Sequence, residues 1–370
     1  MKVINISSAR LYSYDFNQIQ EMSRSVKHSQ RIRSVVLTSV IGIIVGSLFA
    51  AIAFGFEWVR ILKGLTAGFM ITFIISILEN FIFQNKFKKL KFSTALMIRT
   101  VCYVVAISIS VIIVWVVHES SVNEAGILTT LSSEDFRYFI TEGDFKKILL
   151  FAIIVSFLII FFRQINSLLG KNVLRKYLTG KYHSPKEEER VFMFLDLSSS
   201  TTIAEKLSPI EYHRFINNYF FDIDEEIVRS KGEIYQYVGD EVVISWKGND
   251  GFDGANCINC FFEIRNKINS LSEKYKSKFG VVPGFKAGLH CGNVVTGEIG
   301  DSKREIVFHG DVLNTAARLQ SQCNELGKKF LASEDVLKKI ILPAELSVVP
   351  MGSFMLRGKA QETEIFSIEK

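Results

Sequence analysis

The first half of the chain alternates long apolar runs with short polar segments. Four runs stand out before Arg163, and they cover residues 34–56, 64–83, 100–117 and 148–162. The first has 23 residues without a charge, enough to cross a bilayer as an α-helix. The last has only 15 uncharged residues and spans if the basic residues at its two ends reach outwards. The pattern predicts an N-terminal four-helix transmembrane bundle over 34–162; buried helices of a large soluble core are the alternative.

Basic residues gather on one side of these runs. The leader, 1–33, and the loop after the second run are rich in lysine and arginine, whereas the other two loops are not: the basic residues are Lys2, Arg10, Arg24, Lys27, Arg31, Arg33, Lys86, Lys88, Lys89 and Lys91. The positive-inside rule then predicts a multi-pass protein of the inner (plasma) membrane, with both termini cytoplasmic. The leader is too long and polar for a cleavable signal peptide.

The net charge of +6 fits this topology, because much of the excess base lies beside the spans. No zinc-finger spacing or basic stripe interleaved with aromatics predicts a nucleic-acid partner. Cys257 and Cys260 have redox-like spacing, but they lie inside a helical pattern without a further ligand, which favours a structural role.

Residues 163–186 form the predicted linker. Apolar residues recur every three or four positions as far as Tyr177, so we expect a helix that continues the fourth span. It either packs against its twin in a dimer or serves as a solvated tether. A polar break over 180–189, containing Pro185, is expected to follow.

Strand and helix signals alternate through 187–370, the predicted catalytic domain. We expect strands at 192–197, 285–290, 294–299 and 306–309, a hairpin at 232–246, and helices at 209–230, 253–279 and 312–324. This is a β-α-β-β-α-β order, which predicts an α+β ferredoxin-like (palm-type) sheet with helices on one face.

Two carboxylates are candidates for metal binding. Asp196 ends the hydrophobic run that begins at Val191, and Asp240 lies in a tight Gly-Asp turn of the hairpin. Such a fold brings both to one edge of the sheet, where a divalent cation such as Mg²⁺ would neutralise them. Taken singly, a helix N-cap and a turn residue are the ordinary alternatives. Asn314 and Arg318, four apart on a helix, suit a developing negative charge.

These segments, in this order, resemble the catalytic domain of class III nucleotidyl cyclases of the membrane-anchored bacterial type. The resemblance rests on 194–196 with Thr201, on 237–240, on 288–292 and on 310–318. It implies an adenylate cyclase: the ribose 3′-hydroxyl of ATP attacks the α-phosphorus and yields 3′,5′-cyclic AMP and pyrophosphate. A diguanylate cyclase is disfavoured, because the hairpin lacks that family's paired glycines and phenylalanine.

The resemblance also assigns roles to individual residues. Two ions per site, Mg²⁺ or Mn²⁺, are implied at Asp196, the Leu197 carbonyl and Asp240. Asn314 and Arg318 are the implied catalytic pair, contributed by the other subunit of a homodimer. The implied phosphate contacts are the backbone of Ser199, Ser200 and Thr201, together with Lys359 beside Arg357; a surface basic pair is the alternative for the last two.

Two positions choose the base in this family, and here they are Gln236 and Val307 instead of the usual lysine and aspartate or threonine. Gln236 both donates and accepts, so it can pair with either purine. Asp311 can supply the missing polar contact or serve as a helix N-cap. ATP is the preferred substrate; a guanylate cyclase and a catalytically decayed nucleotide-binding signalling protein are the alternatives.

Overall fold

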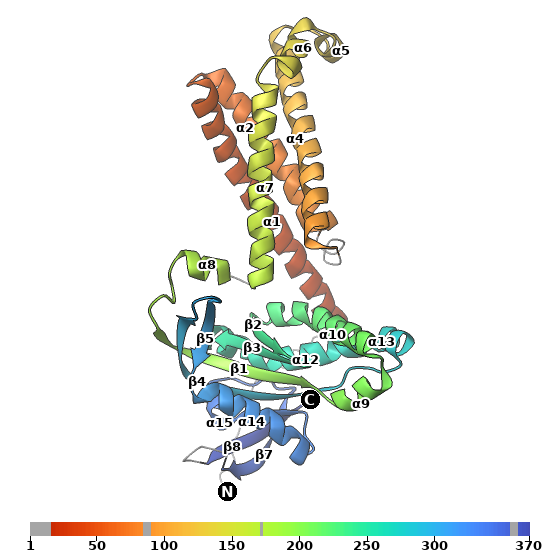
Figure 1. Ribbon diagram of the computed structural model, residues 1–370, viewed down its shortest axis with the longest axis vertical. Coiled ribbons are helices and arrows are strands. Elements are labelled where there is room, and N and C mark those ends of the chain that lie inside the picture. Colours follow the sequence, from red (N-terminus) through yellow and green to blue (C-terminus); the bar gives the residue numbers. More distant parts are fainter. Residues whose placement is uncertain (1–15, 84–89, 171–172, 356–361) are drawn as a thin grey trace. The chain divides into compact units, whose positions relative to one another are not determined.

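The computed structural model describes residues 16–83, 90–170, 173–355 and 362–370 (Figure 1). The chain divides between Leu168 and Leu169 into two compact units, each of which is described by itself. The boundary falls inside the linker that the sequence predicts at 163–186.

The first unit is helical. It contains α1 (Phe16–Phe54), α2 (Trp58–Ile77), the π-helix η1 (Leu78–Phe83), α4 (Phe92–Val122), α5 (Ile127–Leu131), α6 (Glu134–Thr141) and most of α7 (Phe145–Leu169). In the described residues four segments are long and apolar enough to cross a membrane: Ile32–Phe54, Trp58–Phe83, Phe92–Val122 and Phe145–Asn166. The four predicted apolar helices are therefore present.

The helix ends differ from the sequence prediction. The first helix stops two residues early because Gly55 has a φ of +88°, which breaks the helix. The fourth was predicted too short: α7 begins at Phe145 and includes Lys146 and Lys147. Charged residues mark where a span nears the interface but not where its helix ends, since a helix continues freely into water.

Glycines bring α1 and α2 into close contact. Gly42 and Gly46 face Gly64 and Gly68, and a Cβ on Gly46 would lie 2.2 Å from the Gly64 carbonyl oxygen. Each helix thus carries two glycines four residues apart, the small-residue spacing that lets transmembrane helices approach backbone to backbone.

An acid in the second span is paired within the unit. Glu79 lies in η1 and is only 8% exposed. The Tyr103 hydroxyl on α4 donates a hydrogen bond to it, and Arg99 Nε lies 3.8 Å from its Oε1. A buried acid without such partners would be costly in a membrane.

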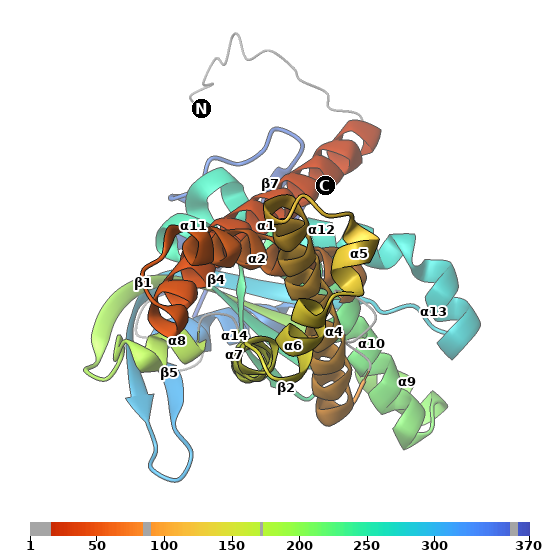
Figure 2. The same ribbon diagram turned by 90° about the horizontal axis from the view of Figure 1, so that it is seen from above.

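The second unit contains one mixed sheet. Its strands are β1 (Lys186–Leu197), β2 (Glu233–Val238), β3 (Glu241–Lys247), β4 (Phe285–Ile299), β5 (Glu305–His309), β6 (Phe330–Ser333), β7 (Ser347–Phe354) and β8 (Thr363–Glu369). The order is β2-β3-β1-β4-β6-β8-β7, with β5 paired to β4. β5 and the end of β4 form a hairpin that projects from the sheet (Figure 2). The β2-β3-β1-β4 core is the ferredoxin-like order that the sequence predicts.

The helices of this unit are α8 (Val173–Leu178), α9 (Ser200–Lys206), α10 (Pro209–Arg229), α11 (Gly248–Phe252), the short 3₁₀ helix η3 (Asp253–Ala255), α12 (Asn256–Ser270), α13 (Ser272–Phe279), α14 (Asp311–Glu325) and α15 (Glu334–Leu337). Ser208 begins α10 with a capping box to Glu211, which explains why this helix starts where the sequence predicts. The predicted helix 253–279 is divided at Leu271 into α12 and α13.

The expectation that helices cover only one face of the sheet is wrong. Alternate residues of β1 point to opposite sides. Val191, Met193 and Leu195 belong to a core with α10 and α12, whereas Phe192 packs with Ala316 of α14 on the other face. Figure 1 shows α14 on the opposite side of the sheet from α10 and α12.

Two predicted strands, 285–290 and 294–299, are one continuous strand, β4. The intervening Gly292 keeps its pairing, opposite Arg190 of β1, so the glycine does not mark a turn. Gly288 of the same strand makes room for a helix. A Cβ there would lie 2.2 Å from the backbone nitrogen of Gln320, so only glycine lets α14 pack this closely.

The predicted linker helix is interrupted. α7 ends at Leu169, Gly170 has a φ of +97°, and α8 is a separate helix from Val173. The polar break expected over 180–189 is also too long, because β1 already begins at Lys186. The charged strand residues are neutralised within the unit, as the fully buried Arg190 pairs with Glu188 at 2.9 Å.

Candidate active site

Asp196 lies at the end of β1, between Glu241 of β3 and Lys286 of β4. Its Oδ2 accepts a hydrogen bond from Gln320 Nε2 at 2.8 Å and lies 3.2 Å from Lys286 Nζ. Burial raises the pKa of Asp196, as does the charge of Asp240, while Lys286 and Gln320 oppose the shift. The carboxylate is thus held in place by groups from two neighbouring elements.

Asp240 occupies the turn between β2 and β3. Gly239 before it has a φ of +62°, a conformation that glycine adopts without strain. Glu241 follows as the first residue of β3. Burial and the charges of Asp196 and Asp240 raise the pKa of Glu241 to about 7. The sequence prediction that Asp196 and Asp240 come together is in line with this electrostatic coupling.

We call Asp196, Asp240 and Glu241 the carboxylate cluster. The positive charge of Lys286 lowers the pKa of both Asp196 and Glu241, and so offsets part of the repulsion between the carboxylates. Mg²⁺ and Mn²⁺ prefer oxygen ligands such as carboxylates, and their positive charge would neutralise the excess negative charge of the cluster. Among the described residues, no three His, Cys, Asp or Glu side chains are arranged to hold a metal. By their chemistry, two carboxylates near one strand end suit a divalent cation, and the Leu197 carbonyl oxygen stays a predicted third ligand.

The candidate catalytic pair lies on α14. Asn314 is exposed, and the Arg318 side chain is 29% exposed. Among the residues that the structure describes, Arg318 Nη1 is a buried atom without a hydrogen-bond partner, and Asp311 Oδ1 lies 3.9 Å from it. The N–H groups on this atom therefore keep unused capacity for a charge-assisted hydrogen bond.

Asp311 begins α14, after Gly310 at the N-cap position. Its Oδ2 accepts a hydrogen bond from the Thr315 hydroxyl at 3.2 Å. An acid in the first helical turn also suits the helix dipole. These contacts favour the helix-terminal role of Asp311 over a contact with the base, although it is the first helical residue rather than the N-cap.

One chain does not bring all the candidates to one place. With about 100° per residue, Gln320 is about 200° around α14 from Arg318. Gln320 faces Asp196 of its own chain, so Arg318 lies on the far side of the helix from the carboxylate cluster.

The two base-choosing candidates lie on strands β2 and β5, which contact each other through the residues next to the candidates. Gln236 is exposed on β2, just after a β-bulge, and Val307 is half-buried on β5. The rings of Tyr235 and Phe308, adjacent to them, are 4.9 Å apart. The sequence predicted these two positions from the resemblance; the aromatic contact between their strands is new.

The phosphate-binding candidates are placed in part. Ser199, with a φ of 58°, precedes α9, whose first residues are Ser200 and Thr201. The segment therefore follows Asp196 and Leu197 directly, as the sequence predicts. Lys359 and Arg357 lie outside the described residues.

Sequence reasoning missed several side chains at this site. Lys286 could have been found from strand register alone, since it pairs directly with Asp196. Gln320 gave no signal, because its role depends on how α14 docks. Tyr212 of α10 was also missed: burial and then Asp240 raise its pKa, which places it beside the carboxylate cluster.

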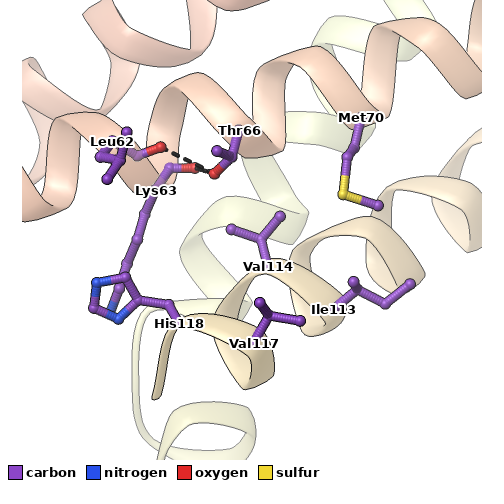
Figure 3. Close-up of a pocket in the computed structure, with 8 residues that line it drawn as sticks. All are labelled: Leu62, Lys63, Thr66, Met70, Ile113, Val114, Val117 and His118. Carbon is purple, nitrogen blue, oxygen red and sulfur yellow. Dashed lines mark hydrogen bonds between the residues drawn. The ribbon is translucent and has the colours of Figure 1, made fainter. Parts of the chain in front are cut away.

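A separate cavity of about 310 Å³ lies in the first unit, between α2 and α4 (Figure 3). Its lining is Leu62, Lys63, Thr66, Met70, Ile113, Val114, Val117 and His118. Lys63 also lies 3.7 Å from Glu119, and the Thr66 hydroxyl bonds back to its own helix. None of the candidate site residues lines this cavity.

Known proteins resemble the part of the chain that carries these candidate residues. The family model described as "Adenylate and Guanylate cyclase catalytic domain" matches residues 183–370, about half of the chain. "Adenylate cyclase 2" of Rhizobium meliloti is 34% identical over 222 residues, which cover 60% of this chain and 61% of that relative. "Receptor-type guanylate cyclase gcy-6" of Caenorhabditis elegans is 25% identical over 199 residues, 52% of this chain and 18% of that relative. The chain thus spans about three-fifths of the first relative's length.

A solved structure shares the fold. A bacterial light-regulated adenylyl cyclase superposes with a TM-score of 0.51 at 22% identity, covering 59% of this chain and 62% of that one. The mixed sheet with helices on both faces is therefore that of class III cyclases. The chain belongs to the adenylate and guanylate cyclase catalytic domain family.

Proposed function

We propose that this protein is a membrane-anchored adenylate cyclase. In this reaction the 3′-oxygen of ATP forms a bond to the α-phosphorus, the bond from that phosphorus to the bridging oxygen breaks, and pyrophosphate leaves. The hydroxyl proton passes to solvent or to a pyrophosphate oxygen. The observation that carries the proposal is the carboxylate cluster at the end of β1, in a chain of this family.

Asp196, Asp240 and the Leu197 carbonyl oxygen are the proposed ligands of two ions, Mg²⁺ or Mn²⁺. When bound, such ions supply charge neutralisation for the triphosphate and activation of the 3′-hydroxyl. Lys286 and Gln320 hold the Asp196 carboxylate from one side, so its orientation is set before any ligand arrives. Preorganisation of this kind removes a reorganisation cost from the reaction.

The proposed active site is shared between two chains of a homodimer. Asn314 and Arg318 lie on the side of α14 away from the carboxylate cluster of their own chain, so a second chain is needed to complete each site. Val307 shortly precedes α14, and Gln236 is tied to it through Tyr235 and Phe308. We therefore assign the base-choosing positions to the same chain as the Asn–Arg pair.

Asn314 and Arg318 would stabilise the charge that builds on the α-phosphate oxygens. The buried Nη1 of Arg318 without a hydrogen-bond partner supports this role. The backbone of Ser199, Ser200 and Thr201 would contact the phosphates of the site that holds its own Asp196. Lys359 is proposed for the terminal phosphates on the resemblance alone.

ATP is the proposed substrate because the 34%-identical relative is named an adenylate cyclase. GTP is the second candidate, and the observation that favours it is the exposed Gln236, whose amide both donates and accepts. The four apolar helices support a membrane anchor, and the charge pattern supports a cytoplasmic catalytic unit.

The test uses the purified full chain in lipid nanodiscs, with Mg²⁺ or Mn²⁺, and with ATP and GTP offered separately. Products are resolved by mass. We expect cyclic AMP and pyrophosphate from ATP at the higher catalytic efficiency. If cyclic GMP is the favoured product, GTP replaces ATP as the substrate. If neither nucleotide gives a cyclic product, the proposed function is contradicted.

A further inference from the structure

A buried arginine lies at the start of the catalytic sheet. Arg190 of β1 is 0% exposed, and its guanidinium contacts Glu188 at 2.9 Å and Glu233 at 3.3 Å. It also donates to the Ser245 hydroxyl at 3.2 Å and lies over the Phe308 ring, 4.8 Å from its centroid. A buried charge requires such partners, so these groups are fixed relative to one another.

Glu233 extends this contact to the segment before the sheet. Its Oε2 accepts a hydrogen bond from Lys176 Nζ of α8 at 3.1 Å, in addition to the bond from Arg190. The Lys176 side chain is only 13% exposed and that of Glu233 is 22% exposed, so solvent screens the pair weakly. Burial opposes ionisation of Glu233, but Lys176 and then Arg190 lower its pKa on balance.

Both strands that carry the base-choosing candidates are tied to α8. Glu233 is the first residue of β2, on which Gln236 follows after the β-bulge. The Tyr177 hydroxyl donates to the Arg304 carbonyl oxygen at 2.9 Å, immediately before β5 and Val307. Bulges re-aim the side chains beside them, so the start of β2 decides where Gln236 points.

We propose that Lys176 and Tyr177 of α8 are positioning residues for nucleotide recognition, acting through Glu233 on the strand of Gln236 and through Arg304 on the strand of Val307. The inference rests on the proposed function, whose base site it deepens. Neither residue touches the nucleotide. Their effect is on binding of the base, so it appears in KM and in nucleotide affinity and leaves the chemical step nearly unchanged.

The matched variants lie on one short helix. Lys176→Met removes the charge and keeps an apolar chain of similar length, Lys176→Arg retains the charge, and Tyr177→Phe removes only the hydroxyl bond. Arg175→Met is the control, because Arg175 is exposed on the same helix. All are made in the full chain, and thermal unfolding confirms that each is folded.

Two readouts separate this inference from the proposed function. One is KM and kcat for ATP; the other is equilibrium binding of 3′-deoxy-ATP, which lacks the attacking hydroxyl and cannot cyclise. We expect Lys176→Met and Tyr177→Phe each to weaken binding about three- to tenfold, as for one lost polar contact. KM should rise in parallel while kcat stays within about twofold.

Lys176→Arg should recover most of the affinity, and Lys176→Met should have no further effect when Glu233 is already Gln. Binding of 3′-deoxy-ATP equal to that of the Arg175→Met control would overturn the inference, even in an active enzyme. A fall in kcat at unchanged affinity would also overturn it. A wild-type chain that binds 3′-deoxy-ATP but forms no cyclic product would sink the proposed function, and the binding series would still decide the role of α8.

Discussion

Gln320 on α14 donates a hydrogen bond to the Asp196 carboxylate at the end of β1, over 2.8 Å. This bond fixes the side of α14 that faces the carboxylate cluster of the same chain. Arg318, about 200° away around the helix, therefore faces outwards. The two proposed half-sites of one chain thus lie on opposite sides of α14, and this arrangement is the reason for proposing a homodimer.

Asp196→Ala and Asp240→Ala should each lower kcat/KM for ATP by about a hundredfold or more, because a metal ion supplies several kcal/mol of charge stabilisation. The fold should survive, since neither side chain belongs to the apolar core. Cyclic nucleotide production and Mn²⁺ binding, followed by electron paramagnetic resonance, are the two measurements. Asp253→Ala, at an exposed acid that pairs with Lys231, is the control and should change neither. Near-normal turnover in either active-site variant would show that the carboxylates do not serve the ions.

Gln236→Lys combined with Val307→Asp should raise the ratio of ATP to GTP catalytic efficiency. The double change installs the pair that related adenylate cyclases use. A site built for one base edge rejects the other through unpaired polar groups, so a shift of about 1–3 kcal/mol is expected. Competition between the two nucleotides in one reaction measures the ratio. Retained activity with an unchanged ratio would mean that other groups read the base.

Glu233→Gln should make the protein less sensitive to acid. The pKa of Glu233 is lowered in the folded state, because Lys176 and Arg190 outweigh the effect of burial. A lowered pKa stabilises the fold above the unfolded value of 4.5, and this contribution is lost as the pH falls through the folded pKa. The free energy of unfolding of the variant should therefore be about 1–3 kcal/mol lower than that of the wild type at pH 7, and the difference should be smaller at acid pH.

Thermal unfolding of the full chain at pH 7 and at pH 4 measures this difference. Glu225→Gln is the control, because its ion pair with Arg229 is substantially exposed and contributes little. Equal destabilisation of Glu233→Gln at both pH values would contradict the assigned ion pairs.

Gly46→Ala should destabilise the first unit by about 1–3 kcal/mol, the usual range for overpacking. The added Cβ would lie 2.2 Å from the Gly64 carbonyl oxygen and 2.9 Å from Gly68 Cα, so α1 and α2 must separate. Ala53→Val, at an exposed position of the same helix, is the control. Thermal unfolding in detergent compares them, and equal stability of the two variants would disprove the close helix contact.

The sequence predicts those parts of this fold that depend on local signals. The hairpin around Asp240 follows from Gly239, and the start of α10 follows from Ser208 and Pro209, because turns and caps are encoded by the residues that form them. The four apolar helices follow from length and hydropathy in the same way. Asp196 could be identified because it directly follows the hydrophobic run of a buried strand.

The parts that failed depend on contacts between distant elements. Helical periodicity shows that α14 has an apolar side but not which face of the sheet receives it. The strands expected at 285–290 and 294–299 are a single strand, because Gly292 between them pairs with Arg190 of β1. Lys286, Gln320 and the pair formed by Lys176 and Glu233 depend on register and docking, which no local pattern contains.

The most direct test of the shared site mixes two inactive chains. A homodimer of Asp240→Ala lacks this carboxylate in both sites, and a homodimer of Arg318→Ala lacks the guanidinium in both sites. Each homodimer is therefore expected to be inactive. In a heterodimer one site carries both lesions and the second carries neither. Differently tagged chains are co-expressed, purified through both tags and assayed with ATP and Mg²⁺ or Mn²⁺. We expect cyclic AMP production to return to about half of the wild-type rate per dimer, because one of the two sites is intact; heterodimers that remain inactive would contradict a shared site.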